Sequence, residues 1–152
     1  FNVEKPKESA YKIEGLEVAT KSASTDSTEA KVVEAVDIKV LLAMGDLAHG
    51  EKVFKKCTAC HQIAAGGKNM IGPNLWGVIG RTSGSISDYK YSKAMIAHAK
   101  EWSFEEMNSY LIKPQAHIKG TKMAFAGLRK EKDRASVILY MNSKSDSPKP
   151  TP

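Results

Sequence analysis

The chain of 152 residues lacks several features that define common classes of protein. It has no run of 18 or more apolar residues, so we expect no membrane-spanning segment within it. No stretch alternates apolar and polar residues as a strand does, and only 7% of the residues are aromatic. The chain starts at Phe1 rather than Met, and FNVEKPKESA has no apolar core, so we expect a processed or cut chain without a signal peptide. Helices joined by long Gly-rich loops, with so few aromatic side chains, need something large to pack around.

Charge is present but unevenly distributed. Residues 1–44 hold 6 basic and 8 acidic residues, a net charge of −2, whereas residues 45–152 hold 17 basic and 9 acidic residues, a net charge of +8. A basic surface favours association with acidic partners of any kind, including proteins, nucleic acid and anionic lipid. The excess positive charge therefore predicts an acidic partner for residues 45–152. It does not indicate whether that partner is a protein, a nucleic acid or a lipid surface.

Composition divides the chain into three parts. Residues 1–44 contain SASTDSTEA and are predicted to be a partly disordered linker or N-terminal extension, with loose helical spacing from Lys31 to Met44. Residues 45–143 are predicted to form one globular domain. Residues 144–152, which contain SDSPKPTP, are predicted to be a disordered tail.

Helix signals within the domain are clear at four places. Asp46 is a candidate cap for a helix that leads to Phe54, and Ser103–Glu106 has the pattern of a capping box, in which Glu106 reaches back to Ser103. Pro114 is expected to stop the helix that Ser103 begins, followed by a loop from His117 to Gly127. The expected helices therefore follow Asp46, span Lys93–Ala99, run from Ser103 to Pro114, and span Lys130–Ser143.

Both cysteines of the chain lie in KKCTACHQ, and His61 follows the second of them. A redox-active C-x-x-C would need a βαβ context, which is absent from the sequence pattern. A structural zinc site needs four ligands, and Cys57, Cys60 and His61 offer three, of which two are adjacent. A third possibility is that the residues are simply buried. The remaining possibility is C-x-x-C-H as the attachment signature of a c-type haem, with two thioether bonds and the histidine as an iron ligand. We take this last interpretation.

A haem ligated by His61 needs a sixth ligand or an open site. The candidates are Met123, within the small-residue loop GTKMAFAG, the other methionines, and the remaining histidines, which are His49, His98 and His117. A methionine thioether is a soft ligand that favours ferrous iron. The residues alone do not decide between a ligand and a packed side chain, which is the commoner role of methionine.

From Gly45 to about Ser143 the sequence resembles the class I cytochromes c of mitochondria and alphaproteobacteria. The resemblance lies in GDLAHGEKVFKKCTACH, GGKNMIGPNLWGVIGR, YKYS, YLIKP, GTKMAFAG and the region of Trp102, in the family's order and spacing. It implies an all-α class I cytochrome c fold, with several helices and long loops wrapped around one covalently bound haem c.

The resemblance also implies a role for individual residues. Cys57 and Cys60 match the haem-attachment cysteines, His61 and Met123 match the two iron ligands, and the Pro73 carbonyl matches the acceptor of the His61 ring N–H. Further matches surround the haem. They are Arg81, Tyr91 and Trp102 near the propionates, Tyr110 and Thr121 beside the methionine, Phe125 near the exposed haem edge, and Gly50 with Tyr140 where the first and last helices cross.

Two features depart from the core family. Met95 stands where many relatives have an asparagine that holds a buried water, so this water network is in doubt. The N-terminal 44 residues are similar to the linkers of membrane-anchored alphaproteobacterial cytochromes c, which implies a transmembrane helix before Phe1. The alternative is a soluble periplasmic cytochrome with an N-terminal extension.

The resemblance implies an electron carrier rather than an enzyme. We expect a monomer on the periplasmic side of the cytoplasmic membrane, with a cytochrome bc-type complex as donor and a haem-copper oxidase as acceptor. A basic ring around the haem edge would meet acidic surfaces of these partners. Its candidates are Lys52, Lys55, Lys56, Lys68, Lys122 and Lys130. Alternatives are partnership with other reductases or photosynthetic complexes, a haem sensor or peroxidase with an open iron site, and a nucleic-acid-binding domain. The last lacks the aromatic residues interleaved with basic ones that such domains use.

Overall fold

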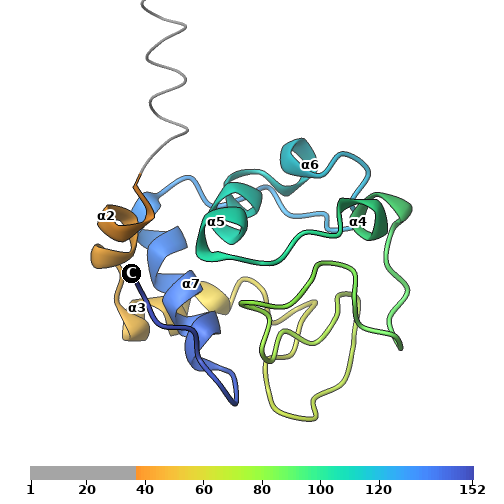
Figure 1. Ribbon diagram of the computed structural model, residues 1–152, viewed down its shortest axis with the longest axis horizontal. Coiled ribbons are helices and arrows are strands. Elements are labelled where there is room, and N and C mark those ends of the chain that lie inside the picture. The colour runs from red at the N-terminus through yellow and green to blue at the C-terminus, as the bar shows by residue number, and fades with distance from the viewer. Residues whose placement is uncertain (1–36) are drawn as a thin grey trace, which may run out of the picture. The chain divides into compact units, whose positions relative to one another are not determined.

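Helices and long loops make up the computed structural model, which describes residues 37–152. The residues from Asp37 to Pro152 form one unit. Within them the only β-type pairing is an isolated bridge between Thr82 and Glu101, so the all-α prediction is confirmed. The helices, shown in Figure 1, are α2 (Ile38–Ala43), α3 (Leu47–Phe54), α4 (Lys93–His98), α5 (Phe104–Ile112), α6 (Pro114–His117) and α7 (Glu131–Ser143).

Capping side chains set where four of these helices begin. The Asp37 carboxylate accepts from the Lys39 amide at α2. The Asp46 carboxylate accepts from the His49 amide at α3, Ser92 Oγ accepts from Met95 at α4, and Ser103 Oγ accepts from Glu106 at α5. Each cap satisfies an amide that has no partner within the first turn of its helix. The predicted starts of α3 and α5 are therefore confirmed.

The second half of the predicted capping box is wrong. Glu106 does not reach back to Ser103, because its carboxylate accepts hydrogen bonds from the rings of His98 and His117 instead. The Ser103 amide donates to the Glu101 carbonyl oxygen at 2.9 Å. His117 was also predicted to begin a loop, but it is the last residue of α6, whose first residue is Pro114. Proline is compatible with the first position of a helix, where its missing N–H leaves no hydrogen bond unmade.

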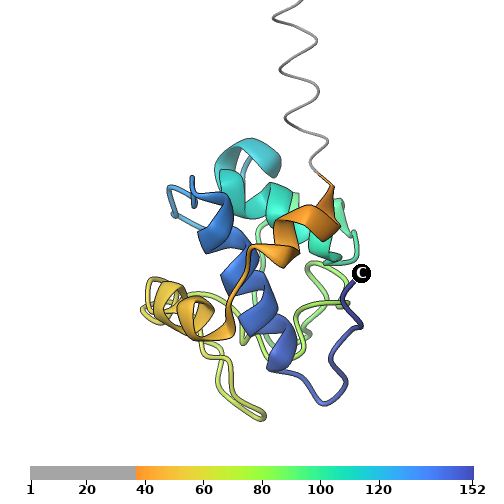
Figure 2. The ribbon, with the colours of Figure 1, turned by 90° about the vertical axis from the view of Figure 1, so that its left-hand side faces the viewer.

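Helices α3 and α7 cross in close contact, as Figures 1 and 2 show. A Cβ atom at Gly50 would lie 2.0 Å from the Ser136 carbonyl oxygen and 2.8 Å from Tyr140 Cβ, so only glycine permits this approach. The Phe54 and Tyr140 rings pack with their centroids 5.3 Å apart. The contact that the resemblance implied between Gly50 and Tyr140 is confirmed. Its effect is to fix α3, and with it the segment that follows α3.

The unit starts earlier than the sequence indicated. Leu41 and Leu42 of α2 are 1% and 5% exposed, and α2 packs against α7. Residues 37–44 therefore belong with the domain rather than with the linker. The rest of the predicted linker, residues 1–36, lies outside the described residues.

The C-terminal residues also pack on the domain. The Asn142 side chain donates to the Lys149 carbonyl oxygen and accepts from the Lys149 amide, each at 2.9 Å. The Gly77 amide donates to the Lys144 carbonyl oxygen at 2.8 Å. Residues 144–152, predicted to be a disordered tail, are thus folded back toward the loop at Gly77 and Gly80.

Candidate functional site

The CxxCH segment follows α3 directly. Backbone hydrogen bonds join the Cys57 amide to the Phe54 carbonyl oxygen at 2.8 Å and the His61 amide to the Cys57 carbonyl oxygen at 2.9 Å. These bonds wind residues 57–61 into tight turns, so both thiols, free and half-buried, project from one short segment. Burial, reinforced by the neighbouring Cys60, raises the pKa of the Cys57 thiol to about 11. Redox-active C-x-x-C thiols have lowered pKa values, so the environment of Cys57 argues against that chemistry.

The His61 ring is held on one side by the following loop. Its Nδ1 lies 2.7 Å from the Pro73 carbonyl oxygen, the contact that the resemblance implied. Burial lowers the pKa of His61 and outweighs the opposite effect of the Pro73 carbonyl. A neutral ring that donates from Nδ1 keeps the lone pair on Nε2, which is the form that ligates metals. A Cβ atom at Gly72 would lie 2.2 Å from His61 Cε1, so the ring also requires glycine there.

Asn74 fastens the loop that carries Pro73. Its side-chain Nδ2 donates to the carbonyl oxygens of Ala64 at 3.0 Å and Gly67 at 2.9 Å. Its backbone N–H donates to Asn69 Oδ1. Sequence reasoning did not assign this role, although the residue lies inside the quoted GPNLWG motif. The consequence is that the acceptor for His61 is itself fixed by side-chain bonds.

Arg81 and Trp102 are brought side by side by their backbones. The Trp102 amide donates to the Arg81 carbonyl oxygen, and the Gly80 amide donates to the Trp102 carbonyl oxygen, both at 2.8 Å. Trp102 is buried, at 6% exposure. The Arg81 Nη1 donates to the carbonyl oxygens of Asn74 and Trp76 at 3.1 and 3.3 Å. The third predicted member, Tyr91, accepts at its hydroxyl from the Ile86 amide at 3.3 Å.

Arg81 leaves one donor without a partner. Its Nε is buried and makes no hydrogen bond to any described residue, and burial lowers the pKa of this guanidinium. A buried unpaired donor on a cation is costly, so an acceptor with negative charge is expected beside it. The carboxylates of a haem are such acceptors. The orphaned Arg81 Nε therefore fits the bound group that the sequence predicted.

Apolar side chains around the interior are covered only in part. Leu75, Met95, Met123 and Phe125 pack against the core, yet each remains partly exposed in the chain alone. Met95, which replaces the polar residue of many relatives, is among them. A flat apolar group placed against these side chains would remove their exposed surface from water, and the porphyrin is of this kind. The partly exposed apolar side chains and the unpaired Arg81 Nε therefore both fit a bound haem.

Met123 lies in a loop that is held by three polar side chains. The Tyr110 hydroxyl donates to Met123 Sδ at 3.4 Å and pairs with Thr121 Oγ1 at 3.0 Å. The Gln115 Nε2 donates to the carbonyl oxygens of Thr121 at 2.9 Å and Met123 at 2.8 Å. The structure thus brings together Tyr110, Thr121 and Met123, as predicted. Gln115 was missed, because a four-residue helix that begins with a proline gives no sequence signal for the bonds that its side chains make.

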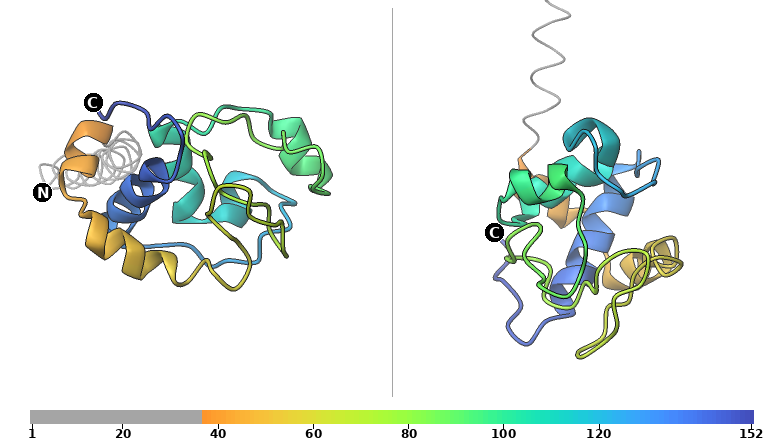
Figure 3. Two further views of the ribbon diagram at one scale, coloured as in Figure 1. Left: turned by 90° about the horizontal axis from the view of Figure 1, so that it is seen from below. Right: turned by 90° about the vertical axis from the view of Figure 1, so that its right-hand side faces the viewer.

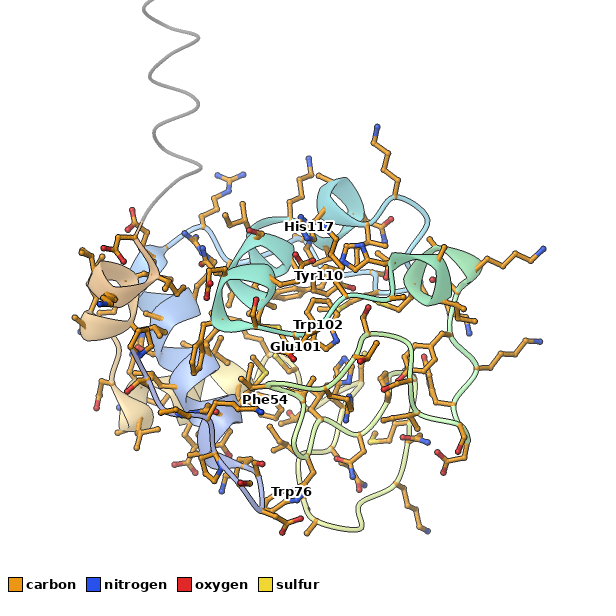
Figure 4. All side chains as sticks on the ribbon, viewed as in Figure 1. Phe54, Trp76, Glu101, Trp102, Tyr110 and His117 are labelled. Carbon is orange, nitrogen blue, oxygen red and sulfur yellow. The ribbon has the colours of Figure 1, made fainter. Side chains whose placement is uncertain are left out.

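The other candidate ligands point elsewhere. The His49 Nε2 lies 2.7 Å from Asp133 Oδ1, and the Nε2 atoms of His98 and His117 each lie 2.6 Å from Glu106 Oε2. Figure 4 shows Trp102, Tyr110 and His117 in succession from Phe54, the last residue of α3, so that His117 is the farthest of the three from Phe54. Among the four histidines, His61 is the one whose Nε2 has no hydrogen-bond partner among the described residues, since its contact is made through Nδ1.

The lysines proposed for docking are all exposed, and none joins the interior cluster. They come from α3, from the CxxCH turn and from separate loops, and Figure 3 shows α3 close to α2, at the end of the unit away from α4. Lys122 differs from the others, since its Nζ donates to the Lys90 carbonyl oxygen and lies 5.5 Å from the centre of the Tyr89 ring.

Comparison with known proteins agrees with this geometry. The family model described as "Cytochrome c" matches residues 47–145. A "Cytochrome c homolog" of Rickettsia prowazekii is 40% identical over 123 residues, which cover 81% of this chain and 70% of the relative. A "Cytochrome c homolog" of Bradyrhizobium diazoefficiens is 38% identical over 141 residues, covering 91% of this chain and 77% of the relative.

Two further relatives carry more specific names. "Cytochrome c-type cyt cy" of Rhodobacter capsulatus is 45% identical over 109 residues, which are 71% of this chain but only 54% of that protein. Among solved structures, "cytochrome cH from Methylobacterium extorquens" superposes with a TM-score of 0.62 at 36% identity, covering 66% of this chain and all of that one.

Proposed function

Since the chain belongs to the cytochrome c family, we propose that it carries single electrons in a respiratory chain, from a cytochrome bc-type quinol-oxidising complex to a haem-copper oxidase. It is an electron-transfer protein rather than an enzyme. The observation that supports the proposal best is the fixed His61 ring, with Nδ1 on the Pro73 carbonyl oxygen and Nε2 free.

Haem c, bound covalently throughout this family, supplies a one-electron iron couple. The chain's own residues attach, orient and enclose it. In this proposal Cys57 and Cys60 form the thioether bonds, and His61 supplies the proximal ligand. Arg81, Tyr91 and Trp102 would hold the propionates, and the unpaired Arg81 Nε would donate to one of these carboxylates. Phe125 lies near the exposed edge.

Met123 is proposed as the sixth ligand. The support is twofold: its loop is fixed by Tyr110, Thr121 and Gln115, and the three other histidines are engaged with carboxylates. The Tyr110 hydroxyl, which donates to Sδ, orients the thioether without blocking its second lone pair. With two axial ligands and no open position, the site suits electron transfer rather than binding of a small ligand.

Absorption spectra test this ligand set. The purified protein, oxidised and then reduced with dithionite, should show a sharp reduced α-band and a weak oxidised near-infrared sulfur-to-iron band. The near-infrared band should vanish in Met123→Ala and persist in Met70→Ala, since Met70 is 43% exposed at the surface. A high-spin spectrum of the unmodified protein that shifts readily with carbon monoxide would instead favour a sensor or peroxidase.

The basic part of the chain supports docking by charge. Residues 45–152 carry a net charge of +8, and the candidate lysines are exposed. Exposed charges speed association with an acidic partner and are screened by salt within about 8–10 Å at physiological ionic strength. We propose Lys52, Lys55, Lys56, Lys68, Lys122 and Lys130 as contacts of this kind.

Salt dependence of the reduction rate tests this docking. The second-order rate of reduction by a purified bc-type complex should fall steeply as ionic strength rises. A variant with Lys55→Gln and Lys56→Gln should start slower and fall less steeply. The matched variant Lys39→Gln with Lys149→Gln, which alters lysines outside the candidate set, should behave like the parent protein. A rate that is independent of salt would exclude electrostatic docking.

We propose a location on the periplasmic side of the cytoplasmic membrane, with attachment by a helix before Phe1. No helix among residues 37–152 is both long and apolar enough to span a membrane. The resemblance of residues 1–44 to the linkers of anchored cytochromes supports attachment. Separation of membrane and soluble fractions of cells expressing the complete gene tests it, because recovery of the haem protein in the soluble fraction would favour the alternative of a soluble periplasmic carrier.

A further inference from the structure

Three side chains that take no part in the proposed haem site converge beside it. His98 ends α4, Glu106 lies in the first turn of α5, and His117 ends α6. The two Nε2 atoms each lie 2.6 Å from the same oxygen, Glu106 Oε2. The three atoms lie within 4.8 Å of one another. Three separate helices thus aim two imidazoles and one carboxylate at a single point.

This cluster is better enclosed than a surface ion pair. The side chains of His98, Glu106 and His117 are 14%, 15% and 26% exposed. The two imidazole rings meet at 69°, with their centroids 5.6 Å apart, so their nitrogen lone pairs approach the common point from different directions. Such divergence is what a tetrahedral metal centre needs and what two stacked rings could not provide.

The frame that carries the ligands is fixed independently of them. The Glu106 amide is capped by Ser103 Oγ at 3.1 Å, and α4 is capped by Ser92 at its start. Ala99 closes α4 in a left-handed conformation, with φ of 45°. Pro114, which begins α6, is fully buried. Ligands on short, fixed helices lose little conformational entropy when they bind an ion.

We propose that His98, Glu106 and His117 form a binding site for a divalent transition ion of the zinc class. Two imidazole nitrogens and one carboxylate oxygen are ligands that zinc prefers, and three protein ligands leave a fourth position for water. Ligand bonds of about 2.0–2.2 Å place tetrahedral ligand atoms roughly 3.4 Å apart. The present 2.6 Å contacts therefore open by less than about 1 Å as the ion replaces the two shared hydrogens.

The site adjoins the functional interior. The His98 and Trp102 ring centroids are 6.4 Å apart, and those of His117 and Tyr110 are 6.3 Å apart. The His98 ring would therefore separate a bound ion from Trp102. The His117 ring would separate it from Tyr110, whose hydroxyl donates to Met123 Sδ. The proposal depends only on the three ligands, so it can be tested whichever electron-transfer partners the protein has.

Zinc chloride added to the purified haem-loaded protein, followed by isothermal titration calorimetry, tests the proposal. One ion per chain should bind, and magnesium chloride at the same concentration should neither bind nor compete, because magnesium prefers oxygen ligands. Loss of an outer-sphere partner of a metal ligand weakens binding by about 10–100-fold, so removal of a direct ligand should weaken it at least about 100-fold. Glu106→Gln and His117→Gln should each show this loss.

The His49–Asp133 pair provides the matched control. It has the same chemistry and a contact of 2.7 Å, but no third ligand from residues 37–152 lies with it. His49→Gln should bind zinc as tightly as the parent protein. Zinc should also raise the melting temperature of the parent and of His49→Gln, but not of Glu106→Gln, whose visible spectrum confirms that it is folded. Absence of zinc binding by the parent protein, or equal weakening in His49→Gln and His117→Gln, would overturn the assignment.

Discussion

Gln115 shows how much one side chain contributes to the loop that carries Met123. Its Nε2 donates to two carbonyl oxygens, at Thr121 and Met123, and so closes the loop across its base. Each such hydrogen bond contributes about 1 kcal/mol net. The other side-chain bonds of the loop are those of Tyr110, Thr121 and Lys122. Local opening of the loop should therefore depend on Gln115 more than global unfolding does.

Gln115→Ala should release the Met123 loop early. As urea is added, the near-infrared sulfur-to-iron band should disappear at a lower concentration than in the parent protein, while far-ultraviolet circular dichroism changes less. Gln62→Ala is the control, because the Gln62 amide oxygen accepts from the Lys68 amide in a different loop. Identical shifts of the band in the two variants would show that Gln115 has no special role in holding Met123.

The sequence predicted some residues of this site and not others, and the difference has a physical reason. Cys57, Cys60 and His61 were recognisable because haem attachment through C-x-x-C-H requires these residues at this spacing, whereas Met123 and Pro73 were implied only by the resemblance to the cytochromes c. Gln115, Asn74 and Glu106 act through bonds to backbone carbonyls or to residues that are distant in sequence. Many polar side chains could form such bonds, so no spacing identifies the ones that do.

At the scale of the helices, α2 shows that a short element can be fixed by two side chains. Leu41 is 1% exposed and Leu42 is 5% exposed, while the adjacent Val40 is 58% exposed. The sequence pattern in this region was only loosely helical, and composition placed the domain boundary after it. Packing against α7, which no local pattern records, determines that residues 37–44 belong to the domain.

Leu41→Ala should lower the free energy of unfolding by about 2–4 kcal/mol, because it removes buried apolar atoms and leaves a cavity. Val40→Ala, one residue away on the exposed side, should change it by about 0.5 kcal/mol or less. Denaturant unfolding of the haem-loaded proteins, followed by circular dichroism, measures both. Similar losses in the two variants would mean that α2 does not pack on α7 in solution.

At the scale of the whole unit, the interior is incomplete without its prosthetic group. Leu75, Met95, Met123 and Phe125 are only partly covered, and Arg81 Nε has no partner among residues 37–152. The starts of α3 and α5 could be predicted from their capping residues, since these are local signals. The long loops between Cys60 and Lys93 could not, because their course follows the surface of a group that the sequence implies but does not itself contain.

A chain that cannot attach haem should therefore fail to form a stable fold. The double variant Cys57→Ser and Cys60→Ser, purified without haem, should lose near-ultraviolet circular dichroism and unfold without a cooperative transition. Thr58→Ser, which alters an exposed residue of the same turn but keeps both thiols, should fold as the parent does. Cooperative melting of the haem-free variant close to that of the parent would show that the protein core is sufficient by itself.

The crossing of α3 and α7 has a consequence for the order of biosynthesis. A chain made from its N-terminus presents the CxxCH segment well before the residues of α7 exist, and α3 cannot be clamped at Gly50 until Ser136 arrives. Until then nothing holds α3, and the cysteines that follow it, in the half-buried position that they take in the structure. Because the haem-free chain is expected not to fold stably, we expect the haem to be attached before the crossing closes, so the last helix completes the domain after the cysteines have reacted.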